Sequence, residues 1–292
     1  MERDEDRPGA GARNGGGSQG GGEASYVYAV VEVRDVPIPE MLPCAGVIGA
    51  PVYAVASQGL AAIVSPVAPE VFSAEALEAK LHELTWVAAN AMAHQEVLAW
   101  LLTRRYTIAP VRFGTLCSDP DHVRTVLTRH AQHFVQTLGR VEGATEWGLK
   151  LSCDGHAVAE WAKSRNVQAG RMTGGVVGMS EGAAYFAHKQ LEQRVRKETA
   201  HLLGAHARDL HTRLSSVARA AVTHPVPAGG VRRDGPTVLL HAAYLVADAS
   251  VEAFHAAVCT KPGPGAPPGI TCETTGPWPP YNFVNTVLEE LG

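Results

Sequence analysis

The sequence predicts an α+β protein of two parts that follow a glycine-rich head. Residues 26–118 show short segments of strand periodicity around one helical segment. From residue 119 onward, the strand and helix patterns follow an order like the ferredoxin-like β-α-β-β-α-β arrangement, with extra helices inserted. Residues 1–25 hold eight glycines and a run of mixed charge. We expect this head to be disordered, because it cannot bury enough apolar surface to offset the entropy of ordering.

The N-terminal part is expected to begin with a strand at Tyr26. Side chains alternate there with a period of two, which places Val27 and Ala29 on one face and Tyr28 and Val30 on the other. A proline-rich link without regular structure follows this strand.

A hairpin and a long helix complete the N-terminal part. Strands are predicted at residues 52–56 and 60–64, and a turn joins them at Gln58 and Gly59. Ser73 is expected to cap a long helix, either continuous or broken near Thr85, that reaches the basic pair at residues 104–105. Its apolar stripe should pack on the sheet, with a partner-binding seam as the alternative, and consists of Leu77, Leu81, Leu84, Ala88, Ala91, Leu98 and Leu102. A strand at residues 107–115 ends this part.

The C-terminal part is predicted to open with one helix that runs from Pro120 to Val141, capped by Asp119 and followed by Gly143. We expect His130, in its apolar stripe, to be a core histidine rather than a metal ligand.

The next strand is predicted at residues 146–152. Trp147 should point into the core, whereas Glu146 and Lys150 should pair on the exposed face, a contact of little energetic value. A short helix at residues 156–163 and a glycine loop at residues 170–182 follow.

The longest predicted element spans residues 181 to about 221, as one very long helix or two stacked ones. Unbroken, it would extend roughly 60 Å and would have to lean on another element or a partner. Its basic side chains are interleaved with acids, so they form a solvated face or a polar docking face. Three further strands and one helix complete the ferredoxin-like order. The strands are predicted near 221–226, at 238–246 and at 270–274, and the helix at residues 251–258.

Composition narrows the class of protein. Hydrophobic residues make up 46% of the chain and charged residues 18%, as in a soluble globular protein. The net charge of −4 gives no global footprint for nucleic acid or an anionic membrane. No stretch has the length of a membrane-spanning helix, and the charged N-terminus does not resemble a signal peptide. The 5 scattered cysteines favour reduced thiols and a cytoplasmic location.

The sequence contains no catalytic constellation. His201, His206 and His211 are five residues apart, so on a helix each is rotated about 140° from the last and they cannot converge on a metal. The glycines at residues 174–178 match neither phosphate-binding motif, so a flexible connection is favoured over an anion site. We therefore assign no catalytic residue, metal ligand or cofactor.

Seven short runs, in order over residues 26–283, resemble the gas vesicle protein L/F family. They are Tyr-Val-Tyr-Ala-Val-Val at 26–31, His-Gln-Glu-Val-Leu at 94–98, Pro-Val-Arg-Phe-Gly-Thr at 110–115, Glu-Trp-Gly-Leu-Lys at 146–150, Gly-Ala-Ala-Tyr-Phe at 182–186, Ala-Ala-Tyr-Leu-Val at 242–246 and Thr-Gly-Pro-Trp-Pro-Pro-Tyr at 275–281. His241 departs from the pattern, since many relatives have Asn there. The resemblance implies an N-terminal α+β domain at residues 26–118. It also implies a modified ferredoxin-like domain at residues 119–292, with a long inserted helix and an extended tail.

The resemblance further implies a non-enzymatic role in building gas vesicles, hollow protein shells that give some microbes buoyancy. Such a protein would bind the hydrophobic shell protein and other accessory proteins, and would need no cofactor, nucleic acid or membrane. The alternatives are a minor structural component retained on the shell and a small-molecule-binding ferredoxin-like regulator.

The candidate partner-binding residues are Arg112, Phe113, Trp278, Pro279, Pro280 and Tyr281. Arg112 could instead form an internal salt bridge. The prolines predict a stiff, polyproline-like strap that presents Trp278 and Tyr281 either to a partner's pocket or to the protein's own domain.

Overall fold

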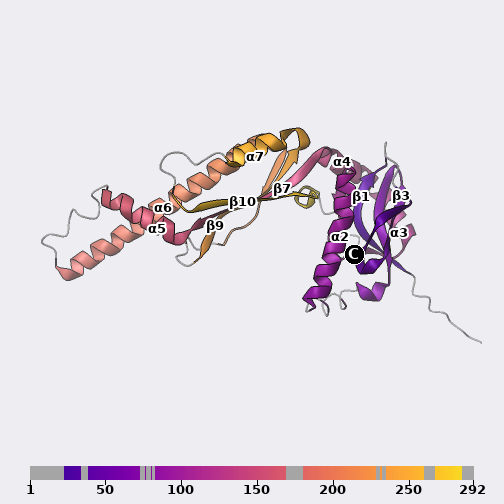
Figure 1. The fold of residues 1–292 in the computed structure, drawn as a ribbon, viewed down its shortest axis with the longest axis horizontal. Coiled ribbons are helices and arrows are strands. Elements are labelled where there is room, and N and C mark those ends of the chain that lie inside the picture. Colours follow the sequence, from indigo (N-terminus) through magenta and orange to yellow (C-terminus); the bar gives the residue numbers. More distant parts are fainter. Residues whose placement is uncertain are drawn as a thin grey trace, which may run out of the picture.

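The computed structural model describes residues 23–33, 39–72, 76, 80, 83–168, 180–227, 231, 235–259 and 267–284. The described chain is elongated, with two sheets that lie apart along its long axis (Figure 1). Helices and antiparallel sheets are combined, which confirms the predicted α+β class. The predicted disorder of the head falls mostly outside the described residues, but Ala24 and Ser25 already belong to the first strand.

The first sheet has the strand order β2-β3-β4-β1-β5, and β6 also pairs with β1. All of these pairs are antiparallel. The strands are β1 (Ala24–Glu32), β2 (Met41–Ala45), β3 (Pro51–Ser57), β4 (Leu60–Val67), β5 (Ile108–Pro110) and β6 (Leu116–Cys117). The predicted hairpin is confirmed as β3 and β4. Strand β2 occupies the link predicted to be irregular, and its Pro43 is tolerated because β2 is an edge strand.

The alternation predicted for β1 changes phase part-way along the strand. Its register against β4 shifts between Val27 and Ala29, so Tyr28 occupies a bulge. Tyr28 and Ala29 therefore pack in one core cluster, whereas Val27 and Val30 pack in another. The prediction that Tyr28 and Val30 share a face is wrong, because one inserted residue inverts a two-residue period.

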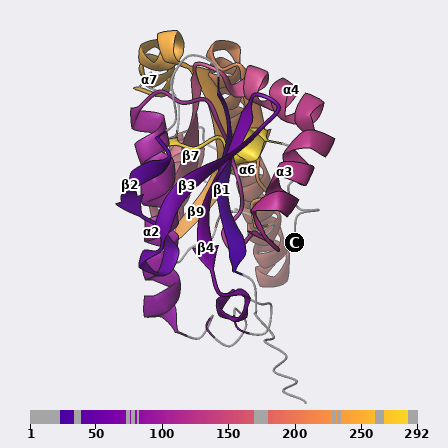
Figure 2. The same ribbon diagram turned by 90° about the vertical axis from the view of Figure 1, so that its right-hand side faces the viewer.

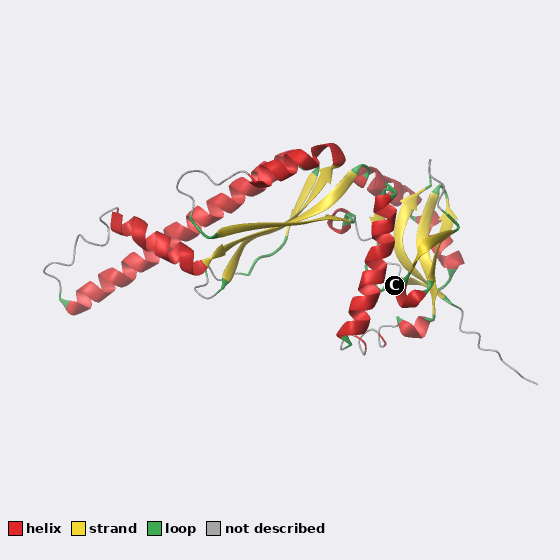
Figure 3. Ribbon diagram, viewed as in Figure 1, coloured by secondary structure: helices red, strands yellow, loops and turns green. Residues whose placement is uncertain are grey.

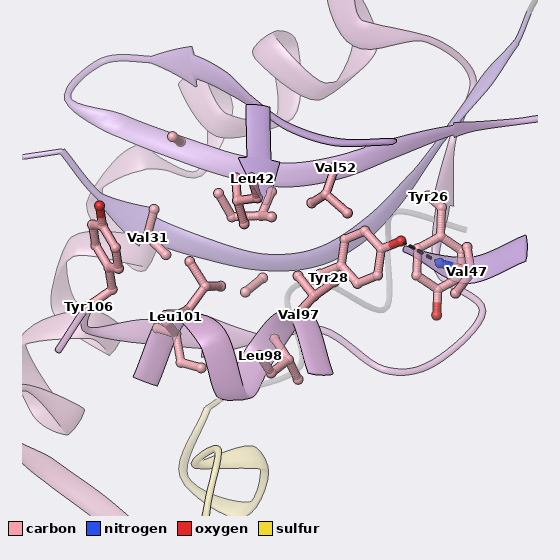
Figure 4. Close-up of a cluster of buried hydrophobic side chains, with 14 of the residues drawn as sticks. Tyr26, Tyr28, Val31, Leu42, Val47, Val52, Val97, Leu98, Leu101 and Tyr106 are labelled. Carbon is pink, nitrogen blue, oxygen red and sulfur yellow. Dashed lines mark hydrogen bonds between the residues drawn. The ribbon is translucent and has the colours of Figure 1, made fainter. Parts of the chain in front are cut away.

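Helices cover both faces of this sheet (Figure 2). α2 (Leu84–Thr103) lies on one face, and α3 (Pro120–Arg129) and α4 (Ala131–Val141) lie on the other. In the core under α2, Val97, Leu98 and Leu101 contact the sheet (Figure 4). The Tyr28 hydroxyl accepts a hydrogen bond from the Val47 N–H at 2.9 Å, at the start of the 3-10 turn Val47–Gly49.

The apolar stripe predicted to pack the long helix on the sheet matches the buried face of α2 only in part. Ser73, Leu77 and Leu81 lie outside the described residues. Leu98 is buried, but Leu84 is 78% exposed and Ala88 is exposed too. The inner face instead carries the buried polar residues Asn90 and His94 besides its apolar ones. Because apolar residues surround the whole helix, periodicity cannot tell its inner face from its outer face.

Two other predicted elements are divided. The strand predicted at residues 107–115 ends at Pro110, and a turn with Gly114 at φ 89° separates β5 from β6. The helix predicted as continuous from Pro120 to Val141 breaks at His130, which is half-buried between α3 and α4 rather than in the core. The Asp119 cap is confirmed, since its carboxylate accepts the N–H of His122 at 2.7 Å.

The second sheet has the order β10-β7-β9-β8, all antiparallel. Its elements are β7 (Ala144–Asp154), α5 (Gly155–Gln168), α6 (Glu181–Val217), β8 (Ala220–Thr223), β9 (Pro236–Ala247), α7 (Val251–Cys259) and β10 (Ile270–Trp278). Numbered along the chain, the strands lie in the order 4-1-3-2 of a ferredoxin-like sheet, as the sequence predicts. α6 is a single helix of 37 residues, so the unbroken alternative is confirmed.

α6 forms an arm that extends beyond its own sheet (Figure 3). Its C-terminal half packs on the sheet through Ala207, Leu210 and Leu214, whereas its N-terminal half lies beside α5 (Figure 1). The predicted glycine loop between these helices falls mostly outside the described residues.

The predicted domain boundary at residues 118 and 119 stays a prediction, although α3 and α4, on its C-terminal side, pack on the first sheet. Side-chain and tail contacts between described residues connect the two sheets. The Arg219 guanidinium donates to the carbonyls of Arg140 and Glu142, at 3.0 and 2.7 Å. After β10, the turn η4 (Tyr281–Phe283) returns to the first sheet.

Candidate functional site

The candidate residues of the tail follow strand β10. Trp278 pairs opposite Glu146 of β7, after a register shift that begins at Thr275. Pro279 and Pro280 are then buried, and η4 begins at Tyr281. The prediction of a polyproline-like strap is wrong, because Gly276 has a φ of 134° and Trp278 still pairs with β7 as the last residue of β10. The tail here continues the sheet instead.

Tyr281 closes a chain of hydrogen bonds that connects the tail to the first sheet. Its hydroxyl lies 2.9 Å from Nε2 of His94 on α2, and Nδ1 of His94 lies 2.9 Å from the Tyr26 hydroxyl of β1. The Tyr26 hydroxyl accepts the N–H of Gly114 at 3.2 Å. Gln95 Nε2 also donates to Tyr281 at 3.4 Å. We call Tyr26, His94 and Tyr281 the tail clasp.

Burial keeps the tail clasp uncharged. It lowers the pKa of His94 to about 4, so the imidazole is neutral at pH 7, with one ring nitrogen as a donor and the other as an acceptor. Burial also raises the pKa of Tyr281 to about 12 and raises that of Tyr26 further. Because the imidazole and both hydroxyls are neutral at pH 7, the tail clasp is suited to a structural hydrogen-bond chain rather than to acid–base chemistry.

Glu146 forms a second contact with the tail. Its carboxylate accepts the N–H of Asn282 at 2.9 Å and the Asn282 side-chain amide at 2.6 Å. Glu146 is only 6% exposed, and burial raises its pKa despite these hydrogen bonds. The predicted pair with Lys150 on an exposed face is wrong, because the tail covers that face at Glu146. Trp147 packs against the core of the second sheet, as predicted.

Apolar packing reinforces these polar contacts. Tyr281 packs against the core under α2, and Val284 packs against the core on the opposite face of the first sheet. Phe283 packs against a small cluster that contains Val141 of α4 and Leu245 of β9. Three of the four residues from Tyr281 to Val284 thus contact three separate clusters.

The other candidate partner-binding residues are divided between core and surface. Phe113 packs near the tail clasp, with its ring centroid 6.1 Å from that of His94 and 6.2 Å from that of Tyr26. Arg112 precedes it in the turn and is exposed. Trp278 is 46% exposed. The structure therefore brings Phe113 and Tyr281 together inside the protein and leaves Arg112 and Trp278 at its surface.

Sequence reasoning did not single out His94, Glu146 or Asn282 as parts of one site. His94 begins one of the seven family-like runs, and a polar residue in an apolar helix was the available signal. Asn282 directly follows the last of these runs. These residues come together only because the tail returns across both sheets, and no local sequence pattern predicts that return.

The outer side of α2 exposes several apolar side chains. Leu84 is 78% and Met92 63% exposed there, and Ala88, Ala89 and Ala99 are exposed as well. Glu96 is the one charged residue within α2, because the buried His94 is neutral. We call Leu84, Ala88, Ala89, Met92 and Ala99 the α2 outer face.

Within the described ranges, no three His, Cys, Asp or Glu side chains are grouped closely enough to hold a metal ion. The glycines at residues 174–178, on which the anion alternative rests, lie outside those ranges. In the part of the chain that the structure covers, no helix combines the length and apolar character needed to cross a membrane.

The sequence model of the family described as gas vesicle synthesis protein GvpL/GvpF matches residues 24–285. This chain belongs to the GvpL/GvpF family. Gas vesicle protein L of Streptomyces sp. (strain CB03234) is 30% identical over 91% of this chain and 94% of its own length. Gas vesicle protein F of the same strain is 27% identical over 89% of this chain and 99% of its own.

Two crystal structures of GvpF share the fold. GvpF from Microcystis aeruginosa aligns with a TM-score of 0.58 at 16% identity, over 90% of this chain and 99% of that one. GvpF from Anabaena sp. PCC7120 aligns with a TM-score of 0.60 at 17% identity, over 90% and 98%. Membership in the GvpL/GvpF family gives the chain a role related to gas vesicles.

Proposed function

We propose that this protein acts in gas vesicle assembly by binding the hydrophobic shell protein and other vesicle accessory proteins. It performs no catalysis, and it works in the cytoplasm in association with the vesicle. The observation that carries the proposal is the α2 outer face, a set of exposed apolar side chains on one helix.

A helix that is apolar on all sides is normally buried on all sides. α2 buries Val97, Leu98 and Leu101 against the first sheet but exposes Leu84 and Met92. An exposed apolar surface of this kind is typical of a protein–protein contact site.

A hydrophobic shell subunit requires such a contact before it joins the shell. Its unpaired strand edges and apolar surface would otherwise promote aggregation. The α2 outer face can mask apolar surface on the subunit, and the tail clasp holds α2 rigidly at His94, so that the face is preformed.

Co-expression of the affinity-tagged chain with the shell protein and the other vesicle proteins tests the proposal. We expect the shell protein to co-purify with the tagged chain. Absence of association in every combination of vesicle proteins would refute the proposal. Immunodetection of the chain on stripped, washed vesicles tests the alternative, since a retained structural component would resist stripping and an assembly factor would not.

A further inference from the structure

The helical arm contains a groove that the α2 outer face does not involve. The groove has a volume of about 530 Å³ and lies between α5 and the N-terminal half of α6. Val158, Ala159 and Ala162 of α5 and Leu191 and Val195 of α6 form its apolar floor.

Beyond the lining of the groove, α6 continues for several residues toward its start at Glu181. At 100° per residue, Tyr185 lies within about 20° of Glu192 and Arg196, which line the groove. Tyr185 is 63% exposed, and its ring contacts that of Phe186, which is 65% exposed. From Tyr185 to Arg196 the helix rises about 16 Å, which is the length of about three helical turns.

The edge of the groove is basic. Lys163, Arg196 and Lys197 line it together with a single carboxylate, that of Glu192, which lies 3.7 Å from Nε2 of His188. Lys163 pairs with Glu160, but no ion pair engages Arg196 or Lys197 among the residues that the structure describes. Residues 155–168 and 181–200 hold six Lys and Arg against four Glu, in a chain whose net charge is −4.

From this geometry we propose that the groove between α5 and α6 binds an amphipathic helix with acidic flanks from another gas vesicle protein. The apolar face of that helix would cover Leu191 and Val195, its carboxylates would meet Arg196 and Lys197, and Tyr185 would extend the contact. This inference rests on the proposed function and assigns a second docking surface. It favours the docking alternative for the basic face of the long helix over a solvated face.

Site-specific photo-crosslinking in vesicle-forming cells tests the proposal with the full chain. A benzophenone amino acid replaces Ala200, which lines the groove and is exposed, and in a control it replaces Val135 on α4. Mass spectrometry of the Ala200 adduct should identify an acidic, amphipathic helical segment of another vesicle protein. Crosslinks to this chain alone, to a second copy of it or to nothing would overturn the proposal.

A charge reversal provides the matched control. Arg196→Glu should lower the crosslinking yield at Ala200 by about tenfold, whereas Arg194→Glu, about 200° away on the same helix, should leave the yield unchanged. Equal effects of the two substitutions would overturn the proposal. If the shell protein still co-purifies while these tests fail, the groove proposal alone is wrong. If the unmodified chain captures no vesicle protein, the proposed function is wrong as well.

Discussion

The hydroxyl of Tyr281 lies 2.9 Å from Nε2 of His94, although 187 residues separate them in the sequence. Through this contact the C-terminal tail connects the second sheet to a helix of the first. The same imidazole contacts Tyr26 of the central strand β1, so the two ends of the fold share one buried hydrogen-bond chain.

Tyr281→Phe should destabilise the protein by about 1 kcal/mol, because it removes the hydroxyl and leaves a buried ring nitrogen of His94 without its partner. Urea denaturation followed by tryptophan fluorescence measures the change. Tyr185→Phe, which removes an exposed hydroxyl, is the control and should leave the unfolding midpoint in place. An unchanged midpoint in Tyr281→Phe would show that the tail clasp contributes no stability.

Glu146→Gln should cost about 1–3 kcal/mol. The backbone N–H and the side-chain amide of Asn282 each donate to one oxygen of the Glu146 carboxylate. A glutamine side chain has only one oxygen to accept these hydrogen bonds, and its NH₂ group would face the second donor. Asn282→Ala should also destabilise the protein, and the double variant should lose less than the two single losses combined. Lys150→Gln on the same strand should change the free energy of unfolding by less than about 0.5 kcal/mol. Additive losses would contradict the contact.

Acid should weaken the tail clasp between pH 6.5 and 4. The pKa of His94 is about 4 in the folded protein and near 6.5 when unfolded, so the unfolded state binds the extra proton in this range. The resulting stability is present above pH 6.5 and is lost as pH falls toward 4, by up to about 3 kcal/mol.

Unfolding free energies measured across this pH range in the parent and in His94→Gln check this expectation. His94→Gln should flatten the dependence on pH, whereas His201→Gln, at an exposed position, should reproduce the parent's slope. Parallel curves for the parent and His94→Gln would assign the pH dependence to other groups.

Met92→Glu should leave stability within about 0.5 kcal/mol of the parent, because the side chain is exposed. It should reduce co-purification of the shell protein at least about tenfold, since it places a charge in the α2 outer face. Met41→Glu, 62% exposed on edge strand β2, is the matched control and should bind like the parent. Equal retention of the shell protein by both variants would exclude this face.

Trp278→Ala tests the partner-binding role predicted for the exposed part of the tail. Because Trp278 is 46% exposed, we expect a loss of stability smaller than that of truncating a fully buried tryptophan, together with weaker capture of vesicle proteins. Thermal unfolding and co-purification on the same preparations separate the two effects. A large loss of stability with undiminished capture would make Trp278 a structural residue.

Much of the fold was predictable because its signals are local. The β3–β4 hairpin, the Asp119 cap and the ferredoxin-like strand order all follow from periodicity and turn residues within short windows. Predictions failed where a single residue changed the geometry, as at the bulge at Tyr28 and the break at His130. They also failed on α2, because apolar residues on every side remove the periodic signal.

The sequence by itself determined the α+β class, the order of most elements and, through seven short runs, the family. Only the tertiary structure decided that Glu146 is buried, that Tyr281 packs against the core of the first sheet and that Leu84 is exposed. The physical reason is that burial depends on what covers a surface. Here the covering element is a tail that returns across both sheets to residues more than a hundred positions away.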